Sequence, residues 1–373
     1  MCCKEFRPDK NHPHRCYWSE RGNYRESVDL RTHKCFIQPV LAKEDEPRKK
    51  SKDTLKRQRK SNPDVSEYVE PPVKVWADLE TMLDEDGTHI PILIVAETSE
   101  SDEVFEFYGH ECTRDFLAFM DELAYGPEES PRNKHDFREV IGIFHNLKGY
   151  DAVFLQEQMV KEKRRFEFII PNGTKNLCMQ VGKIVHKDSM CFLSMALSAY
   201  SSTFGIPELK KGFFPHKFYT PDHQNYVRPL PAAEYYDPKG MSEKKKKEFE
   251  TWYAEEQRKN LPFDDKKEFI AYCRSDVKLL KAGCLKFIKE FHSIAKFDPM
   301  EKCVTIAQGC NRYWRKCVMT PDSIAIEPDG GWEESVTRRE IRFPSVPLVS
   351  PQKPAGVRQP RKPPHYVNWG TPS

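Results

Sequence analysis

The sequence has little net charge, no long apolar run and no secretory signal, and each of these absences excludes a class of protein. Its 60 basic and 57 acidic residues leave a formal charge of only +3. Overall charge therefore does not indicate a nucleic-acid binder, and any such case must rest on local patches. The longest apolar run, residues 90–96, is too short to span a bilayer, and residues 1–10 are polar. We expect an intracellular protein that is neither secreted nor embedded in a membrane.

Composition divides the 373 residues into five segments. Residues 1–42 are rich in Cys, His and Arg, and residues 43–70 form a basic linker. Residues 71–297 carry the apolar patterns of one folded domain, and 298–332 form a further helical segment. Residues 333–373 contain eight prolines and no periodic pattern, which predicts a disordered tail.

The amino-terminal segment is a candidate zinc site. Twelve cysteines in an intracellular protein are expected to be thiols or metal ligands rather than disulfides. The Cys and His residues of this segment predict zinc at Cys16, His33 and Cys35. Their irregular spacing matches no standard zinc finger, so a segment without metal is the alternative. The basic linker is either a nuclear localisation signal or DNA-contacting arm, or simply a solvated connection.

The folded segment reads as α/β. Closely spaced strands at 73–80, 90–97 and 104–108 predict an antiparallel meander, followed by a helix at 113–124. Three more strands are predicted at 140–144, 166–170 and 177–185, and helices at 152–159, 189–204, 243–257 and 263–297.

Two acidic residues lie in the first predicted strand. Asp78 and Glu80 are two positions apart and therefore share one face. Paired carboxylates in an apolar strand repel each other unless a cation neutralises them, and oxygen ligands of this kind suit Mg²⁺ or Mn²⁺. The alternative is an exposed strand edge with no site.

Two further patterns contain acids with ordinary explanations of their own. In the run from His145 to Asp151, Asp151 opens a helix after a turn, which a helix cap would also explain. In the long helix, Tyr272 and Asp276 are one turn apart on one face. A solvent-facing charge is the alternative for Asp276.

The order of these motifs resembles that of the DEDDy 3′→5′ exonucleases within family B DNA polymerases. The flanking residues narrow the resemblance to the protein-primed branch of organellar, viral and Polinton/Maverick-like polymerases. They are Thr81, the run Phe-His-Asn-Leu-Lys-Gly-Tyr-Asp ending at Asp151, and Lys-Gly-Phe-Phe-Pro beginning at Lys211. The resemblance covers about residues 71–332.

The resemblance implies a ribonuclease-H-like fold and a set of roles. Two Mg²⁺ or Mn²⁺ ions would bind Asp78, Glu80, Asp151 and Asp276, with Tyr272 orienting the attacking water and Lys211 contacting the scissile phosphate. Single-stranded DNA 3′ ends would be held by Thr81, Asn146, Leu147, Tyr150 and Ser189.

The resemblance would also call for polymerase motifs that this sequence does not contain, such as Asp-x-x-Ser-Leu-Tyr-Pro and Asp-Thr-Asp. We therefore expect an exonuclease-bearing fragment of a DNA polymerase that does not polymerise DNA alone. The nucleotides and terminal priming protein of the full-length family are implied partners, and the nucleus is the expected location in a eukaryote. A non-catalytic DNA-binding or interaction remnant of a mobile-element polymerase is the alternative function.

Overall fold

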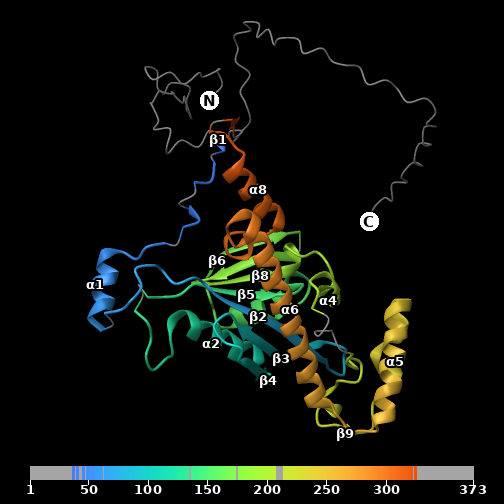
Figure 1. The fold of residues 1–373 in the computed structure, drawn as a ribbon. Helices are drawn as coiled ribbons and strands as arrows, with labels where there is room; N and C mark the ends of the chain where they lie inside the picture. Colours follow the sequence, from blue (N-terminus) through green and yellow to red (C-terminus); the bar gives the residue numbers. More distant parts are fainter. Residues whose placement is uncertain are drawn as a thin grey trace, which may run out of the picture. The chain divides into compact units, whose positions relative to one another are not determined.

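A seven-stranded mixed sheet lies at the centre of the computed structural model, in the order β4-β3-β2-β5-β8-β7-β6 (Figure 1). The first three strands in the chain form an antiparallel meander, as predicted. β5 is parallel to β2 and β8 is parallel to β5, whereas β7 and β6 continue the sheet in antiparallel pairs. A meander extended by parallel strands with helices on both faces is the ribonuclease-H-like arrangement, so the predicted α/β fold class is confirmed.

The structure describes residues 36–325, except for 38, 42–43, 47, 62, 134–135, 174, 207–212 and 322. The sheet strands are β2 Val73–Leu83, β3 His89–Thr98, β4 Val104–Tyr108, β5 Val140–Phe144, β6 Phe166–Asn172, β7 Lys175–Val181 and β8 Ile184–Asp188. Two-residue strands are β1 Phe36–Ile37, β9 Val227–Arg228, β10 Phe263–Asp264 and β11 Ile324–Ala325.

The helices differ widely in length. The α-helices are α1 Lys52–Ser61, α2 Cys112–Tyr125, α3 Asp151–Lys161, α4 Tyr200–Thr203, α5 Glu243–Lys259, α6 Asp265–Ala295, α7 Pro299–Lys302 and α8 Ile306–Cys317. Short 3₁₀ helices are η2 Leu147–Gly149, η3 Ser189–Cys191, η4 Leu197–Ala199, η5 Pro221–His223, η6 Ala233–Tyr236 and η7 Pro238–Gly240. Among the described residues, no helix is both long and apolar enough to cross a membrane.

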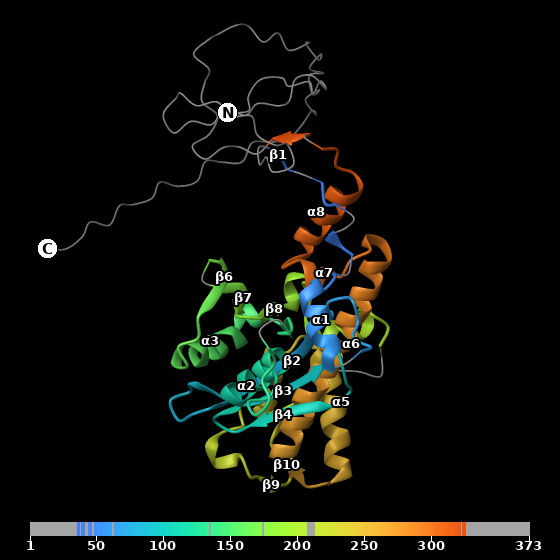
Figure 2. The ribbon, with the colours of Figure 1, turned by 90° about the vertical axis from the view of Figure 1, so that its left-hand side faces the viewer.

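The sheet separates two apolar cores. Helix α6 packs on one face over Trp76, Met82 and Leu93, and α2 and α3 cover the other face over Val75, Leu79 and Ile94. Figure 2 shows α2 and α3 on one side of the strands and α6 on the other. Because side chains alternate along a strand, even-numbered residues of β2 such as Trp76 point toward α6, and odd-numbered residues such as Val75 point toward α2 and α3.

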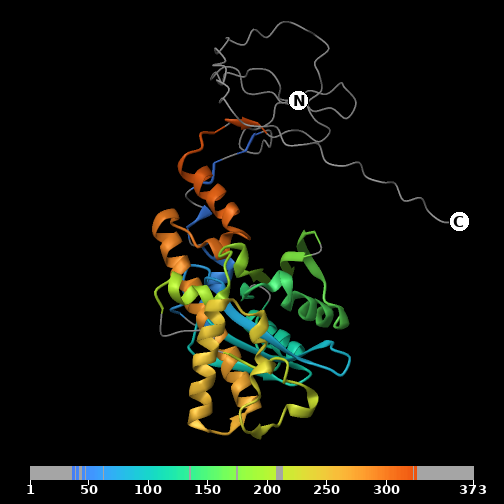
Figure 3. The same ribbon diagram turned by 90° about the vertical axis from the view of Figure 1, so that its right-hand side faces the viewer.

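Helix α6 is a 31-residue element whose ends the sequence specifies. Asp264 caps its start by accepting a hydrogen bond of 3.2 Å from the Lys267 backbone N–H. The helix ends at Ala295, and the next residue, Lys296, takes a left-handed φ of 60°. The lysine-rich helix α5 precedes it and runs back alongside its first half (Figure 3). Helix α6 packs against β2 and β3.

Three predicted elements differ from the structure. The strand predicted at 177–185 is two strands, β7 and β8, because Gly182 takes a left-handed φ of 56° and turns the chain. The helix predicted at 189–204 is a series of short turns, η3, η4 and α4. Within the predicted linker, residues 52–61 form helix α1, which is held to the domain by Arg57 and its ion pair with Asp136 at 2.9 Å.

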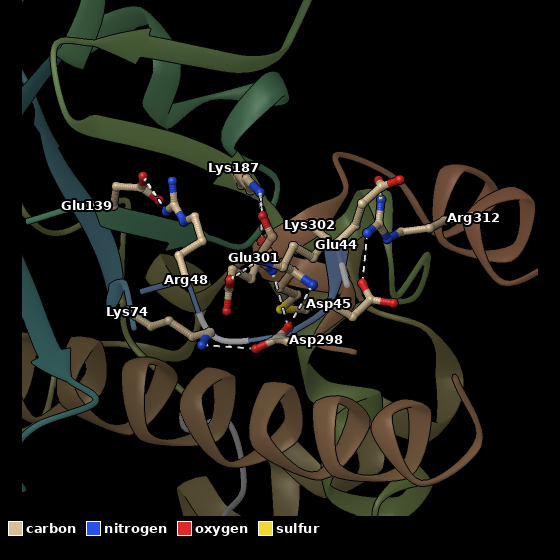
Figure 4. A network of polar contacts seen from close by, with 11 residues as sticks. Glu44, Asp45, Arg48, Lys74, Glu139, Lys187, Asp298, Glu301, Lys302 and Arg312 are labelled. Atoms are coloured by element: carbon tan, nitrogen blue, oxygen red, sulfur yellow. Dashed lines mark hydrogen bonds and ion pairs between the residues drawn. The ribbon is translucent and has the colours of Figure 1, made fainter. Parts of the chain in front are cut away.

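The chain beyond residue 297 is anchored to the sheet by a buried lysine (Figure 4). The Nζ of Lys187, on β8, donates hydrogen bonds to the carbonyls of Met300, Glu301 and Cys303 at 2.7, 3.2 and 2.9 Å. Burial lowers the pKa of Lys187, and three carbonyls match the three donors of an ammonium group. Lys74 of β2 adds an ion pair of 2.9 Å with Asp298.

The same network holds the segment before β2. Asp45 forms ion pairs of 2.7 Å with both Arg312 and Lys316 of α8, and Arg48 pairs with Glu139 at 2.8 Å. Residues 36–324 accordingly form one compact unit. We propose that the folded domain extends beyond the predicted limits of 71 and 297 in both directions.

Candidate active site

Two carboxylates of β2 begin the site. Asp78 and Glu80 share the parity of Trp76 and Met82 and therefore lie on the sheet face that α6 covers. Both are half-buried. Their carboxylate oxygens and the Sγ of Cys273 all lie within 4.8 Å of one another. The sequence pattern thus brings two acids to one point under the helix.

A third acid comes from the first turn of α3. Asp151 is 3% exposed. Burial first, and then the nearby Asp78 and Asp188 carboxylates, raise the pKa of Asp151 well above its ordinary value. Tyr150 occupies the helix-cap position, and it makes no side-chain cap hydrogen bond. Helix capping therefore does not explain this buried acid, whereas closeness to Asp78 joins it to the pair on β2.

The fourth acid lies on α6. Asp276 is 1% exposed, one turn after Tyr272. Between them Cys273 is buried, and its Sγ lies 3.6 Å from the Asp78 carbonyl oxygen and 3.9 Å from its Oδ2. Burial and then Asp78, Glu80 and Asp276 raise the pKa of the Cys273 thiol. Cys273 therefore adjoins three of the acids, and we call Asp78, Glu80, Asp151 and Asp276 the acidic cluster.

The acidic cluster suits a hard divalent cation. Asp78 and Glu80 lie together. Burial and then the nearby Asp78 raise the pKa of Asp151, and burial and then neighbouring acids that include Asp276 raise the pKa of the adjoining Cys273 thiol. Like charges raise each other's proton affinity in this way unless a cation compensates them. Carboxylate oxygens are the donors that Mg²⁺ and Mn²⁺ prefer. The Cys273 thiol keeps its proton in the cation-free protein, and carboxylates outnumber it around the site, so the donor set favours a hard cation.

The ring of Tyr272 packs against two other rings near the acidic cluster. The ring of Tyr272 lies 5.2 Å from that of His216 in an edge contact and 5.8 Å from that of Phe214. The Nδ1 of His216 lies 4.0 Å from Oε2 of Glu80. His216 thus lies between the ring of Tyr272 and the Glu80 carboxylate.

A buried carboxylate shapes the loop before Asp151. Asp188, at the end of β8, accepts hydrogen bonds from the backbone N–H groups of Asn146, Lys148 and Met190 at 3.0, 3.2 and 2.8 Å. Asn146 takes a left-handed φ of 68° and is exposed. Asp188 therefore fixes the turn that presents Asn146 to solvent.

Gly149 leaves room for the Asn146 amide, which gives a first testable prediction. A Cβ at Gly149 would meet Oδ1 and Nδ2 of Asn146 at 2.5 and 2.6 Å, so Gly149→Ala must displace the amide. If Asn146 grips DNA, the affinity for a single-stranded oligonucleotide should fall by about three- to tenfold, the cost of one polar contact. Fluorescence anisotropy measures this loss. Gly240→Ala is the matched control, since a Cβ there would likewise displace the end of a side chain, Oδ2 of Asp237 at 2.6 Å, and an equal loss in both variants would contradict the prediction.

Thr81 and Tyr150 meet on the opposite face of β2. Their hydroxyl oxygens lie 2.6 Å apart. The Nδ1 of His89, at the start of β3, lies 2.9 Å from the Thr81 hydroxyl and 2.7 Å from the Tyr150 hydroxyl. Burial raises the pKa of Tyr150, so its hydroxyl keeps its proton. The structure thus joins two predicted DNA-contacting residues through a histidine that was not predicted.

The remaining predicted residues divide into buried ones and ones outside the described part of the chain. Leu147 is 1% exposed and packs in the core under α2 and α3. Ser189 is 0% exposed, and its Oγ lies 2.9 Å from Nδ1 of His145. Both side chains face the protein. Lys211 lies outside the described residues, as do Cys16, His33 and Cys35.

Sequence reasoning missed Asp188, His89, His216 and Cys273. Asp188 had a readable signal, since it directly precedes the predicted Ser189. Cys273 adjoins Tyr272 in the chain, but its thiol looks like any buried cysteine. His89 and His216 come from a hairpin and a long loop, where spacing does not indicate what they contact.

Comparison with known protein families gives a match over more than half of the chain. The family model described as DNA polymerase type B, organellar and viral, matches residues 134–342, more than half of the chain. This match contains Asp151, Tyr272 and Asp276, and it begins after β2. A curated relative, a probable DNA polymerase of Agaricus bitorquis, is 28% identical over 174 residues, which are 42% of this chain and 20% of that protein.

Two solved structures to which the chain is similar are those of DNA polymerases. Phi29 DNA polymerase complexed with single-stranded DNA is 14% identical with a TM-score of 0.36, over 59% of this chain and 32% of that one. The family B polymerase of the archaeon Pyrobaculum calidifontis is 14% identical with a TM-score of 0.33, over 64% and 28%. The chain thus spans about a fifth of the curated relative and about a third of these polymerases.

Proposed function

We propose, from the premise that this chain belongs to the type B DNA polymerases of organelles and viruses, that it carries a metal-dependent 3′→5′ DNA exonuclease at the acidic cluster. The observation that carries the proposal is the pair Asp78 and Glu80, whose carboxylate oxygens lie within 4.8 Å of each other and of Cys273 Sγ. It is supported by the buried Asp151, whose pKa burial and then Asp78 raise, and by the buried Asp276, which together with burial raises the pKa of the Cys273 thiol. Such a group gains nothing for stability without a cation. It has the composition that phosphodiester hydrolysis with two metal ions requires.

The acids are assigned as the cation ligands. Asp78, Glu80, Asp151 and Asp276 would hold two Mg²⁺ or Mn²⁺ ions, which when bound lower the pKa of a water molecule and stabilise the leaving 3′ oxygen. Burial of Asp151 and Asp276 excludes bulk water from one side of the cluster. Tyr272, which directly precedes Cys273 and is in edge contact with His216, would position the attacking water through its hydroxyl.

The reaction consumes one water for each nucleotide released. The water oxygen bonds to the terminal phosphorus, and the bond from that phosphorus to the preceding 3′ oxygen breaks. The 3′ oxygen takes up a proton, and a nucleoside 5′-monophosphate leaves. By the family's pattern, Lys211 is assigned to the scissile phosphate.

The single strand is assigned to residues next to the acids in the chain, since Thr81 directly follows Glu80 and Tyr150 directly precedes Asp151. Asn146 is exposed, and Thr81 and Tyr150 are half-buried with joined hydroxyls, so all three are accessible for contact. An aromatic ring with flanking polar groups suits a frayed strand of any sequence. Because Leu147 and Ser189 are buried, we assign them to positioning the loop and not to direct side-chain contact. We assign no nucleotide transfer to this chain.

The proposal is tested by incubating the full chain with a 5′-labelled single-stranded oligonucleotide and Mg²⁺ or Mn²⁺. We expect a ladder of products shortened from the 3′ end, and a chelator should stop their formation. A primer with a mismatched 3′ terminus should be shortened faster than a matched one, because a frayed end reaches the site more readily. An oligonucleotide that stays intact with both metals would contradict the proposal.

A non-catalytic DNA-binding protein is distinguished by the same preparation. Calorimetric titration with Mn²⁺ should show binding that Asp276→Asn weakens. Single-strand binding without either metal binding or shortening of the oligonucleotide would favour the non-catalytic function.

A further inference from the structure

We infer that His89 is a positioning residue for single-stranded DNA, holding the hydroxyls of Thr81 and Tyr150 together next to Asp151, the acid that directly follows Tyr150. The inference rests on the proposed function and extends it to a residue outside the acidic motifs. Its basis is a three-way contact on one face of β2, in which every pair of polar atoms is within hydrogen-bond distance.

The position of His89 results from one extra residue in β3. Glu80 faces Leu93 across the ladder whereas Thr81 faces Pro91, so Ile92 has no partner of its own. Ile92 and Leu93 both contribute to the core under α6, although neighbours in a regular strand point to opposite faces. A bulge of this kind is expected at Pro91, which has no N–H to donate into the ladder.

The bulge decides which face His89 occupies. After it, Thr81 faces Pro91 and Leu83 faces His89, so His89 lies on the face of Thr81. With continuous pairing from Glu80 and Leu93, His89 would instead face Asp84 and lie on the α6 side. The shift therefore moves an imidazole from the side of the acidic cluster to the side of Tyr150.

The ring contacts complete the arrangement. The His89 ring meets the Tyr150 ring edge-on at 5.5 Å, and Phe154 of α3 meets Tyr150 edge-on at 5.2 Å. Tyr150 is thus held between an aromatic ring from α3 and the imidazole from the hairpin. Each hydroxyl can donate one hydrogen bond and accept others, so one of them can turn to a bound strand while Nδ1 of His89 keeps the other in place.

The chemistry of the contact suggests the ligand and the effect. His89 is exposed and Thr81 is half-buried, so hydrogen bonds among these groups contribute little to folding. Their value lies in orienting Tyr150 before a strand arrives, which lowers the entropic cost of binding. The expected ligand is a DNA 3′ end of any sequence, recognised by ring stacking and by hydrogen bonds to its sugar and phosphate oxygens.

The test compares His89→Ala, His89→Asn and the control His110→Ala in the full chain. Asn can place a polar atom near the position of Nδ1, and His110 is an exposed histidine in the turn before α2. The probe is a 5′-fluorescent single-stranded oligonucleotide, with anisotropy in a chelating buffer giving Kd and shortening in Mn²⁺ giving KM and kcat.

We expect His89→Ala to raise Kd and KM by about three- to tenfold, the effect of losing one polar partner, with kcat and Tm unchanged. His89→Asn should restore most of the affinity, and His110→Ala should match the unaltered protein. An unchanged Kd in His89→Ala, or equal defects in the Ala and Asn variants, would overturn the inference. An unaltered protein that neither binds nor shortens the oligonucleotide would show that the proposed function itself has failed.

Discussion

Asp276→Asn is expected to abolish 3′-end shortening while leaving the protein as stable as the parent, or more so. Asn keeps the size of the buried side chain but removes one charge from a group of four carboxylates, which relieves repulsion in the metal-free protein. The same change removes a cation ligand, and kcat should fall by about a thousandfold or more, as when a group acting on the transition state is lost. Single-turnover shortening in Mn²⁺ and thermal unfolding in a chelator measure the two effects.

Asp265→Asn is the matched control for this change. Asp265 begins the same helix, is 0% exposed, and has a pKa that burial raises to about 7. It precedes Asp276 by 11 residues, which separates the two by roughly 16 Å along a helix. It should keep the shortening activity. Activity that survives Asp276→Asn, or that is lost equally in both variants, would remove the acidic cluster from the mechanism.

Asp188→Ala is expected to unfold the loop that carries Asn146. The carboxylate accepts three backbone hydrogen bonds and is 0% exposed, and hydrogen bonds to a charged group contribute about 1.5–3 kcal/mol each before losses elsewhere. We expect the free energy of unfolding to fall by about 3–5 kcal/mol, a cost typical of breaking a buried polar network. Single-strand binding should fall with it, because the exposed left-handed conformation of Asn146 depends on this acceptor.

Denaturant unfolding and oligonucleotide anisotropy test this second expectation together. The control is Asp115→Ala, which removes an Asp from an ion pair of 2.9 Å with Arg114 in which both side chains are about half exposed. Such a surface pair should change stability by less than about 1 kcal/mol. If Asp188→Ala unfolds at the same denaturant concentration as Asp115→Ala, Asp188 does not organise the loop.

Elements with a strong local pattern were predictable from the sequence. The apolar residues of β2 and the long apolar stripe of α6 predicted a strand and a helix at these places. Asp78 and Glu80 lie in that strand, and Asp276 lies in that helix. The segment 189–204 failed for a physical reason. Its apolar residues are spaced as in a helix, but Phe192, Leu193 and Leu197 are buried in the α6 core from separate short turns, so burial and not periodicity determines their spacing.

The contacts between elements could not be predicted from the sequence. Pro91 indicates that β3 is irregular near this point, because it has no N–H to donate into the ladder. The sequence does not indicate, however, that the irregularity is one extra residue that turns His89 to the face of Thr81. The acceptor role of Asp188 depends on β8 ending beside the turn at Asn146, which strand order decides. The acids of β2, α3 and α6 could be proposed together only because their order resembled a known family.

Lys187 limits how short a stable fragment of this domain can be. Its three acceptors belong to Met300, Glu301 and Cys303, so a protein engineered to stop at residue 297 would keep an ammonium group inside the sheet and lose every carbonyl that solvates it. Such a group must either lose its proton or draw water into the core. A stop codon placed after α8 would retain these carbonyls together with the Asp45 ion pairs. The carbonyls of residues 300–303, which follow the last acidic motif, therefore stabilise β8, the strand that ends at Asp188.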